Sequence, residues 1–230
     1  LQPLDLDALK ATVEKAAEGL EGINIQAIVD ETVKNLYNGV KISDIATTMM
    51  MATRTRIEQE PNYTYVTARL LRNELVAKGL EFLGLPEDTP ESDALETFLK
   101  KGIELELLDP ELLKFDLAQL AAAIKPERSN QFTYLGLQTL YDRYFIHSDG
   151  VRYELPQLFF MRVSMGLALN EENREARAIE FYNLLSSFDY MASTPTLFNA
   201  GTLRPQLSSC YLTAIGDDLY NIYGAIRDNA

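Results

Sequence analysis

Thiols, imidazoles and positive charges are scarce in this chain. Its 230 residues include one cysteine, Cys210, and one histidine, His147. A single cysteine excludes an internal disulfide framework and is typical of proteins in a reducing compartment, so we expect a cytoplasmic location. With so few soft ligands, we expect no metal site.

Two further absences narrow the possible partners. No apolar run is long enough to cross a membrane, because the most apolar stretch, residues 155–169, is interrupted by Arg162, and no signal peptide is visible. Lysine and arginine number 21 against 34 aspartates and glutamates, a net charge of −13. This balance argues against a nucleic-acid partner, which needs a basic face, but leaves room for a pocket that takes one nucleotide. The chain has no G-x-x-x-x-G-K word, and so no P-loop.

What the chain does contain is apolar periodicity. Hydrophobic residues make up 47% of the sequence, enough for one or two globular domains. Spacings of three and four residues predict a mainly α protein, with four short helices at about 5–19, 25–37, 43–60 and 63–78. The start and stop signals of these helices are Asp5 or Asp7, Gly19, Asn38-Gly39, Ser43, Pro61 and Gly79.

The middle of the chain continues in the same manner. After a proline-rich linker, further helices are predicted at about 92–103, 110–124, 134–140, 156–169 and 172–187. Between them, two β-rich segments flank Ser148-Asp149-Gly150 and predict a small β-hairpin. His147 lies at the mouth of this turn, where a solvated or locally bonded imidazole is a simpler interpretation than a catalytic one.

The stretch with the most chemistry is STPTLFNAGTLRPQLSSCYL, residues 193–212. It begins with a polar run, residues 193–196, that predicts a turn, and it ends in a short predicted strand, residues 207–212, that contains Cys210. A following helix is expected to be capped by Asp217 or Asp218. A thiol beside small hydroxyls suits redox chemistry, but a lone cysteine is more often a buried apolar side chain, so the pattern alone leaves both interpretations open.

Residues 193–212 resemble the large (α) subunit of class I ribonucleotide reductase, at the point where its helical N-terminal domain enters the catalytic barrel. The shared words are S-T-P-T-L-F-N-A-G-T and P-Q-L-S-S-C-Y-L, with looser similarity at Arg143-Tyr144-Phe145, Glu154-Leu155-Pro156-Gln157 and Met161-Arg162-Val163. The resemblance implies a helical N-terminal domain at 86–206 that includes the hairpin. It also implies that residues 207–230 form the first strand and helix of an α/β barrel.

Residues 1–85 resemble the ATP cone, the four-helix allosteric domain at the front of many such subunits. The matching words are A-A-E-G-L at 16–20, Y-N-G at 37–39, S-D-I at 43–45 and Y-V-T-A-R-L at 65–70. Ala8 and Ala77 stand where we align family lysines, and Ile42 stands where we align a threonine. Because a triphosphate needs several cationic or N–H donors, we expect a degenerate cone that does not bind ATP usefully. Whether an intact cone precedes it stays open.

The resemblance also implies site residues. Cys210 would be the catalytic thiol, one of a pair that reduces a ribonucleotide to a 2′-deoxyribonucleotide, and Thr194, Ser209 and Cys210 would line the substrate pocket. The start of the last helix, Asp217-Asp218-Leu219, would lie at the α–α dimer contact. There it would contribute to the specificity site for allosteric effectors, with Asp217 facing sugar instead of phosphate.

One thiol cannot form a disulfide, and the family's other cysteines, with their neighbouring glutamate and asparagine, are not in this sequence. We therefore expect the N-terminal part of a longer ribonucleoside-diphosphate reductase α subunit, inactive by itself and with no cofactor of its own. The complete enzyme implied by the resemblance reduces ribonucleoside diphosphates, forms an α–α homodimer and is controlled by ATP and deoxynucleoside triphosphates. Its small, radical-generating β subunit carries a metal cofactor, and thioredoxin or glutaredoxin supplies electrons.

Two interpretations from other classes remain beside this one. The first is a non-catalytic helical module for nucleotide sensing or partner docking, in which Cys210 is inert. The second is a plain helical scaffold, although packing alone does not require the polar pattern of residues 193–212. Further cysteines elsewhere in the reading frame would favour the enzyme over the module.

Overall fold

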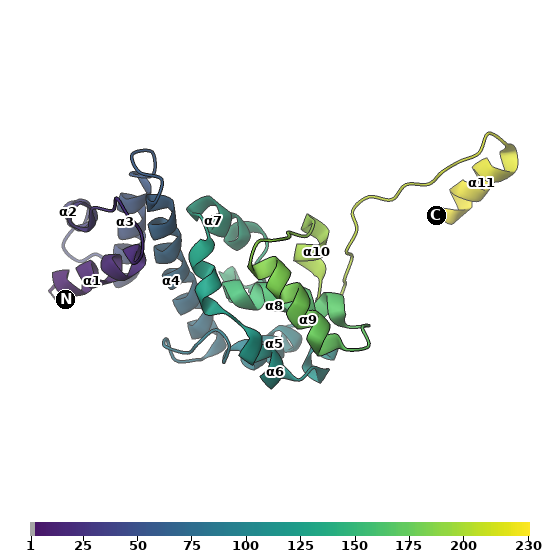
Figure 1. The fold of residues 1–230 in the computed structure, drawn as a ribbon, viewed down its shortest axis with the longest axis horizontal. Helices are drawn as coiled ribbons and strands as arrows, with labels where there is room; N and C mark the ends of the chain where they lie inside the picture. Colours follow the sequence, from purple (N-terminus) through teal and green to yellow (C-terminus); the bar gives the residue numbers. More distant parts are fainter. Residues whose placement is uncertain (1–2) are drawn as a thin grey trace.

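The computed structural model describes residues 3–230 and is mainly helical, with one two-stranded antiparallel sheet in the described part (Figure 1). The prediction of a mainly helical fold with a small β-hairpin is confirmed. The N-terminal elements are α1 (Leu6–Ala17), α2 (Ile25–Lys34), α3 (Ile42–Arg54), α4 (Tyr63–Leu83) and α5 (Leu95–Glu104). The middle elements are η1 (Pro110–Lys114), α6 (Leu117–Ala123), η2 (Pro126–Gln131), α7 (Tyr134–Arg143), β1 (His147–Ser148) and β2 (Val151–Arg152). The C-terminal elements are α8 (Pro156–Ala168), α9 (Arg174–Ser186), α10 (Thr194–Asn199) and α11 (Leu219–Asp228).

The first four helices form a small bundle in which α1 packs on α2 and α4, and α3 packs on α2 and α4. Asp5 caps α1, because its side chain accepts a hydrogen bond from the Ala8 N–H at 2.9 Å. The predicted cap of α3 at Ser43 is wrong. That helix begins one residue earlier, at Ile42, with Lys41 in the cap position and no side-chain cap.

Helix α4 runs past Gly79, where the sequence predicted a stop, and ends at Gly84, whose φ of 69° lies in the left-handed region that favours glycine. Gly79 serves packing instead. A Cβ at this position would lie 2.6 Å from Cδ2 of Leu155 and 3.3 Å from the backbone oxygen of Tyr153. The glycine therefore lets the segment before α8 approach the helix, and a glycine that admits a close neighbour is compatible with a continuous helix.

Through its length, α4 connects the N-terminal bundle to the rest of the fold. It packs on α1 and α3, and also on α5, α7, η2 and β2. One cluster of buried apolar side chains extends from α1 to the turn after α10. The domain boundary that we place after residue 85 falls just beyond this helix and remains a prediction.

At the centre of the second part lies α8, in which every residue from Pro156 to Met165 is buried. Helix α9 packs along it, and η2 and α10 also contact it. The single helix predicted at 110–124 is instead η1 followed by α6, since Asp116 interrupts the run and caps α6 through the Gln119 N–H at 3.0 Å. The predicted hairpin is confirmed: His147 pairs with Arg152 and Ser148 with Val151, around a turn in which Asp149 and Gly150 both have positive φ.

Two predictions for the C-terminal part are wrong. The polar run expected to form a turn begins the helix α10, with Ser193 at its N-cap. Residues 207–212 form no strand in the described chain. A strand is stabilised by hydrogen bonds to a neighbour, and residues 207–217 instead extend away from the helical body and lead to α11 (Figure 1). Across residues 3–230, we find no helix with the length and apolarity needed to cross a bilayer.

Candidate functional site

The candidate substrate residue Thr194 lies in the first turn of α10, and its hydroxyl is 3.1 Å from the hydroxyl of Tyr144. The Tyr144 ring stacks on Phe198 of the same helix, with centroids 4.6 Å apart and planes inclined by 23°. Tyr144 therefore contacts both ends of α10. In the sequence alone, Arg143-Tyr144-Phe145 is a word shared with the reductase family and indicates no role for Tyr144.

The C-terminal end of α10 is held by Arg162, a residue to which the sequence alone assigns no function. Its Nη1 donates to the backbone oxygens of Leu197 and Ala200, at 3.2 and 2.8 Å. Its Nε and Nη2 donate to Oε1 and Oε2 of Glu154, at 2.7 and 3.1 Å, and both side chains are 0% exposed. One signal in the sequence could have pointed to Arg162, namely that it is an arginine inside an otherwise apolar run. A guanidinium buried in such a helix requires hydrogen-bonding partners elsewhere in the fold.

Side chains of α10 also bind the segment that leads to Cys210. The Thr196 hydroxyl donates to the backbone oxygen of Leu207 at 3.3 Å, and Asn199 Nδ2 donates to the oxygen of Gln206 at 2.7 Å. Helix α10 thus carries Thr194 and also sets the direction in which the chain leaves toward Cys210.

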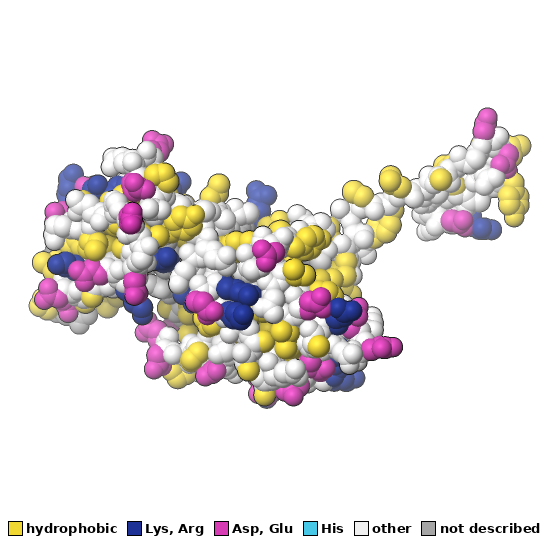
Figure 2. Space-filling model, viewed as in Figure 1, with side chains coloured by type: hydrophobic (Ala, Val, Ile, Leu, Met, Phe, Trp, Pro, Cys, Tyr) yellow, Lys and Arg dark blue, Asp and Glu magenta, His cyan; other side chains and the backbone are white. Residues whose placement is uncertain are grey.

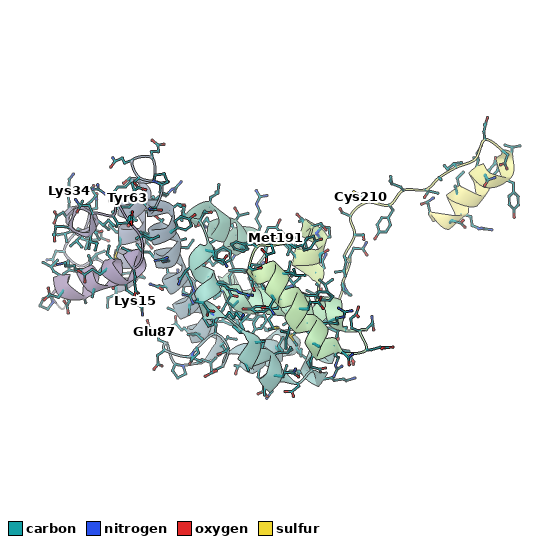
Figure 3. All side chains as sticks on the ribbon, in the orientation of Figure 1. Lys15, Lys34, Tyr63, Glu87, Met191 and Cys210 are labelled. Atoms are coloured by element: carbon teal, nitrogen blue, oxygen red, sulfur yellow. The ribbon has the colours of Figure 1, made fainter. Side chains whose placement is uncertain are left out.

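Cys210 is exposed, so the alternative of a buried core cysteine does not hold in this structure. The thiol lies on the extended segment, clear of the helical body (Figure 3). Its sulfur is 3.7 Å from the hydroxyl of Ser209, which brings two of the predicted site residues together. No hydrogen bond joins Thr194 to Ser209 or Cys210, so the structure brings together only part of the predicted substrate site.

Of the two aspartates predicted to cap the last helix, Asp218 takes that role. Its Oδ1 accepts the Asn221 N–H at 2.9 Å, and hydrogen bonds from the backbone and side chain of Asn221 lower the pKa of this carboxyl. Leu219 is 73% exposed, and Asp217 is also exposed. Helix α11 stands apart from the helical body (Figure 2), and most of its apolar side chains are exposed. The exposed apolar residues of α11 are Leu219, Tyr220, Ile222, Tyr223 and Ile226.

The N-terminal bundle offers a surface hollow of about 510 Å³ between α1 and α2. Lys10 and Lys34 line it together with Asp7 and Asp30, so its two positive charges are matched by two negative ones. In the part of the chain that the structure describes, no group of three or more His, Cys, Asp or Glu side chains is placed to hold a metal ion. His147 lies exposed in β1.

Part of the chain matches a known protein family. Residues 130–205, from η2 through α10, match the family described as "Ribonucleotide reductase, all-alpha domain". This region contains Tyr144, the Glu154–Arg162 pair and Thr194, and it ends just before the segment that carries Cys210.

Individual relatives extend the match to nearly the whole chain. It is 47% identical over 206 residues to the ribonucleoside-diphosphate reductase subunit alpha of Chlamydia muridarum, a match that covers 88% of this chain and 20% of that protein. It is 34% identical to the alpha subunit of Helicobacter pylori strain 26695, over 100% of this chain and 29% of that protein. The large subunit of Danio rerio is 32% identical, over 97% of this chain and 28% of that protein. The chain is therefore similar to the N-terminal region of ribonucleotide reductase large subunits, and it spans between a fifth and three-tenths of these relatives' length.

Proposed function

We propose that this chain is the N-terminal part of a ribonucleoside-diphosphate reductase α subunit, whose complete enzyme converts ribonucleoside diphosphates to 2′-deoxyribonucleoside diphosphates. The observation that carries the proposal is the similarity, over nearly all of the chain, to large subunits from distant organisms. The match of residues 130–205 to the all-alpha domain also supports it.

Cys210 is one of two thiols in the proposed reduction. Two thiols together supply two electrons and two hydrogens; the ribose C2′–O bond breaks, the hydroxyl leaves as water, a C2′–H bond forms and the two sulfurs join in a disulfide. The exposed position of Cys210 supports this role, because the sulfur is accessible to substrate. The second thiol belongs to a part of the subunit outside this sequence, which has one cysteine.

Thr194 and Ser209 are the proposed substrate-binding hydroxyls. Hydroxyl groups combined with backbone N–H groups bind phosphate oxygens even in an acidic protein, because they provide hydrogen-bond donors without a net positive charge. In the complete enzyme, Thr194 on α10 and Ser209 beside Cys210 hold the diphosphate and sugar while the thiol faces the ribose.

The proposed partners follow from the same assignment. A small β subunit, with its metal cofactor, generates the radical that starts the reaction, and thioredoxin or glutaredoxin returns the disulfide to thiols. Two α subunits pair at α11, whose apolar side chains are exposed in the single chain. There Asp217, Asp218 and Leu219 contribute to the effector site, with Asp217 accepting a hydrogen bond from a deoxyribose hydroxyl. The enzyme acts in the cytoplasm.

For the N-terminal bundle, we propose a degenerate ATP cone. Ala8, Ile42 and Ala77 offer no charged or hydroxyl group to a triphosphate, and the acidic residues beside Lys10 and Lys34 offset those two charges. Isothermal titration of the purified chain with ATP and dATP tests this. No heat of binding is expected at micromolar ligand, and a micromolar dissociation constant for either nucleotide would refute the proposal.

A turnover assay tests the main proposal. The complete α subunit, mixed with its small subunit and a dithiol reductant, is expected to form deoxynucleotides, and Cys210→Ser is expected to abolish their formation. Normal turnover by this variant would show that Cys210 is not a reducing thiol. The 230-residue chain alone is expected to form none, because a disulfide needs two cysteines.

A further inference from the structure

Arg162 occupies an unusual place for an arginine. It lies in the middle of α8, surrounded by buried apolar residues, and its side chain is 0% exposed. Its partner Glu154 is equally buried. A buried ion pair of this kind contributes little stability compared with well-packed apolar side chains of the same volume. Stability alone therefore does not account for an arginine here.

What the guanidinium adds is a second set of contacts, made by Nη1 on the side away from Glu154. This nitrogen donates to the oxygen of Ala200 at 2.8 Å and to that of Leu197 at 3.2 Å, with the oxygen of Phe198 at 3.4 Å. These are carbonyls at the C-terminal end of α10, which have no partner within the helix and carry its negative pole.

Helix α10 depends on such external contacts. It has only six residues, and an isolated helix of that length is not stable in water. Arg162, anchored by Glu154, holds its C-terminal end, and Tyr144 contacts Thr194 near its N-terminal end. A displacement of Arg162 therefore shifts the Thr194 hydroxyl.

The same pair reaches the segment that carries Tyr144. Oε2 of Glu154 accepts the N–H of Ile146 at 2.9 Å while it binds Nη2 of Arg162. One carboxylate thus joins the residues just after Tyr144 to the guanidinium that holds α10. One buried ion pair, Glu154–Arg162, therefore orients both α10, which carries the Thr194 hydroxyl, and the segment that carries Tyr144, whose hydroxyl contacts it.

We propose that Arg162 is a positioning residue of the reductase site: anchored by Glu154, it fixes α10 and thereby places the Thr194 hydroxyl that binds the ribonucleoside diphosphate. This inference rests on the proposed function. The position requires arginine specifically, because the planar guanidinium donates hydrogen bonds to a carboxylate and to a set of carbonyls at once. A lysine ammonium does not reproduce this forked geometry.

The test uses the complete α subunit with its small subunit and compares Arg162→Lys, Thr194→Ala and the double variant. Arg162→Lys is expected to raise the KM for the diphosphate substrate by roughly tenfold, with a smaller change in kcat, as expected for the loss of a charge-assisted hydrogen bond that positions a binding group. The double variant is expected to have the same KM as Thr194→Ala, because Arg162 acts through Thr194. Arg177→Lys, an exposed arginine of α9 paired with Glu180, is the matched control and should leave KM unchanged.

Two results would overturn the inference. One is an unchanged KM in Arg162→Lys, with or without a fall in kcat, and the other is a KM in the double variant that multiplies the two single effects. If Arg162→Lys does not fold, Glu154→Gln carries the same test, since it keeps the shape of the anchor and removes its charge; an unchanged KM in the folded Glu154→Gln variant would overturn the inference as well. If the unaltered enzyme forms no deoxynucleotide, the proposed function itself is wrong, and the inference falls with it.

Discussion

Gly166 of α8 and Gly201, just beyond α10, meet backbone to backbone. A Cβ built on Gly166 would lie 2.1 Å from the nitrogen of Gly201 and 2.5 Å from the carbonyl carbon of Ala200. Gly201 itself has a φ of 76°, in the region that favours glycine. This contact brings the turn after α10 against α8, within reach of the Arg162 guanidinium.

Gly166→Ala is therefore expected to destabilise the fold by about 1–3 kcal/mol, because the methyl group would overlap backbone atoms that have little room to move. Chemical denaturation followed by circular dichroism measures the change. The matched control is Gly224→Ala in α11, where an added Cβ meets no atom within 4 Å and alanine should favour the helix. Equal stability of Gly166→Ala and the unaltered chain would contradict the close contact.

Much of this architecture was predictable from the sequence, because apolar spacing reports directly on buried helix faces. Helix α1 begins at its aspartate cap and α11 at Asp218, and the hairpin forms where Asp149-Gly150 requires positive φ. Each of these features depends on residues close together in the chain, which is why local patterns were sufficient.

Features that depend on distant partners were not predictable. Gly79 reads as a helix stop, but its role is to admit Leu155, which is far away in sequence. Residues 207–212 have strand-forming composition but no neighbouring strand within the described chain. Arg162 looks like an interruption of an apolar run until the carbonyls of α10 are brought beside it.

Breaking a second ion pair, between the buried Glu91 and the partly exposed Arg72, should lower the stability of the fold strongly. Glu91 is 3% exposed; its Oε1 lies 2.7 Å from Nη2 of Arg72 on α4, and its Oε2 accepts the N–H of Gln157 in α8 at 2.9 Å. Glu91→Ala is expected to cost about 3–5 kcal/mol, because it leaves the arginine and a helix N–H without a partner. Urea denaturation measures the loss. Glu96→Ala, which breaks an exposed pair with Lys100, should cost no more than about 1 kcal/mol. Similar losses in the two variants would show that the Glu91 contacts add nothing beyond a surface pair.

Two buried tyrosines provide a matched test of hydrogen bonding. Tyr153 is 0% exposed and its hydroxyl has no hydrogen-bond partner among residues 3–230, whereas the Tyr182 hydroxyl accepts the Lys125 N–H at 2.8 Å and donates to Gln157 Oε1 at 2.7 Å. Tyr153→Phe is expected to be neutral or stabilising by up to about 1 kcal/mol, and Tyr182→Phe to cost about 1–3 kcal/mol. Thermal unfolding of the two variants gives the comparison. A large loss in Tyr153→Phe would reveal a partner for that hydroxyl, such as a bound water.

The same tyrosines predict a loss of stability at alkaline pH. Burial raises the pKa of Tyr153, and the nearby Glu154 raises it further; burial also raises the pKa of Tyr182. In the unfolded chain both phenols ionise near the ordinary pKa of about 10. Above that pH the unfolded state releases protons that the folded state keeps. The contribution of the two tyrosines to stability should therefore be fully present below pH 10, and the free energy of unfolding should decrease as the pH rises further. Denaturation midpoints between pH 8 and pH 11.5 measure this decrease, which should be smaller in Tyr153→Phe. An identical pH profile for this variant would contradict the raised pKa.

The exposed thiol allows a direct check on the placement of Cys210. Because Cys210 is exposed on an extended segment, a disulfide-exchange reagent such as Ellman's reagent is expected to modify its sulfur completely in the native chain. The absorbance of the released thiolate should correspond to one equivalent, and denaturant should add nothing. Cys210→Ser is the control and should release none. A native chain that reacts only after unfolding would place the cysteine inside the fold, and it would favour the inert-core interpretation over the reducing thiol.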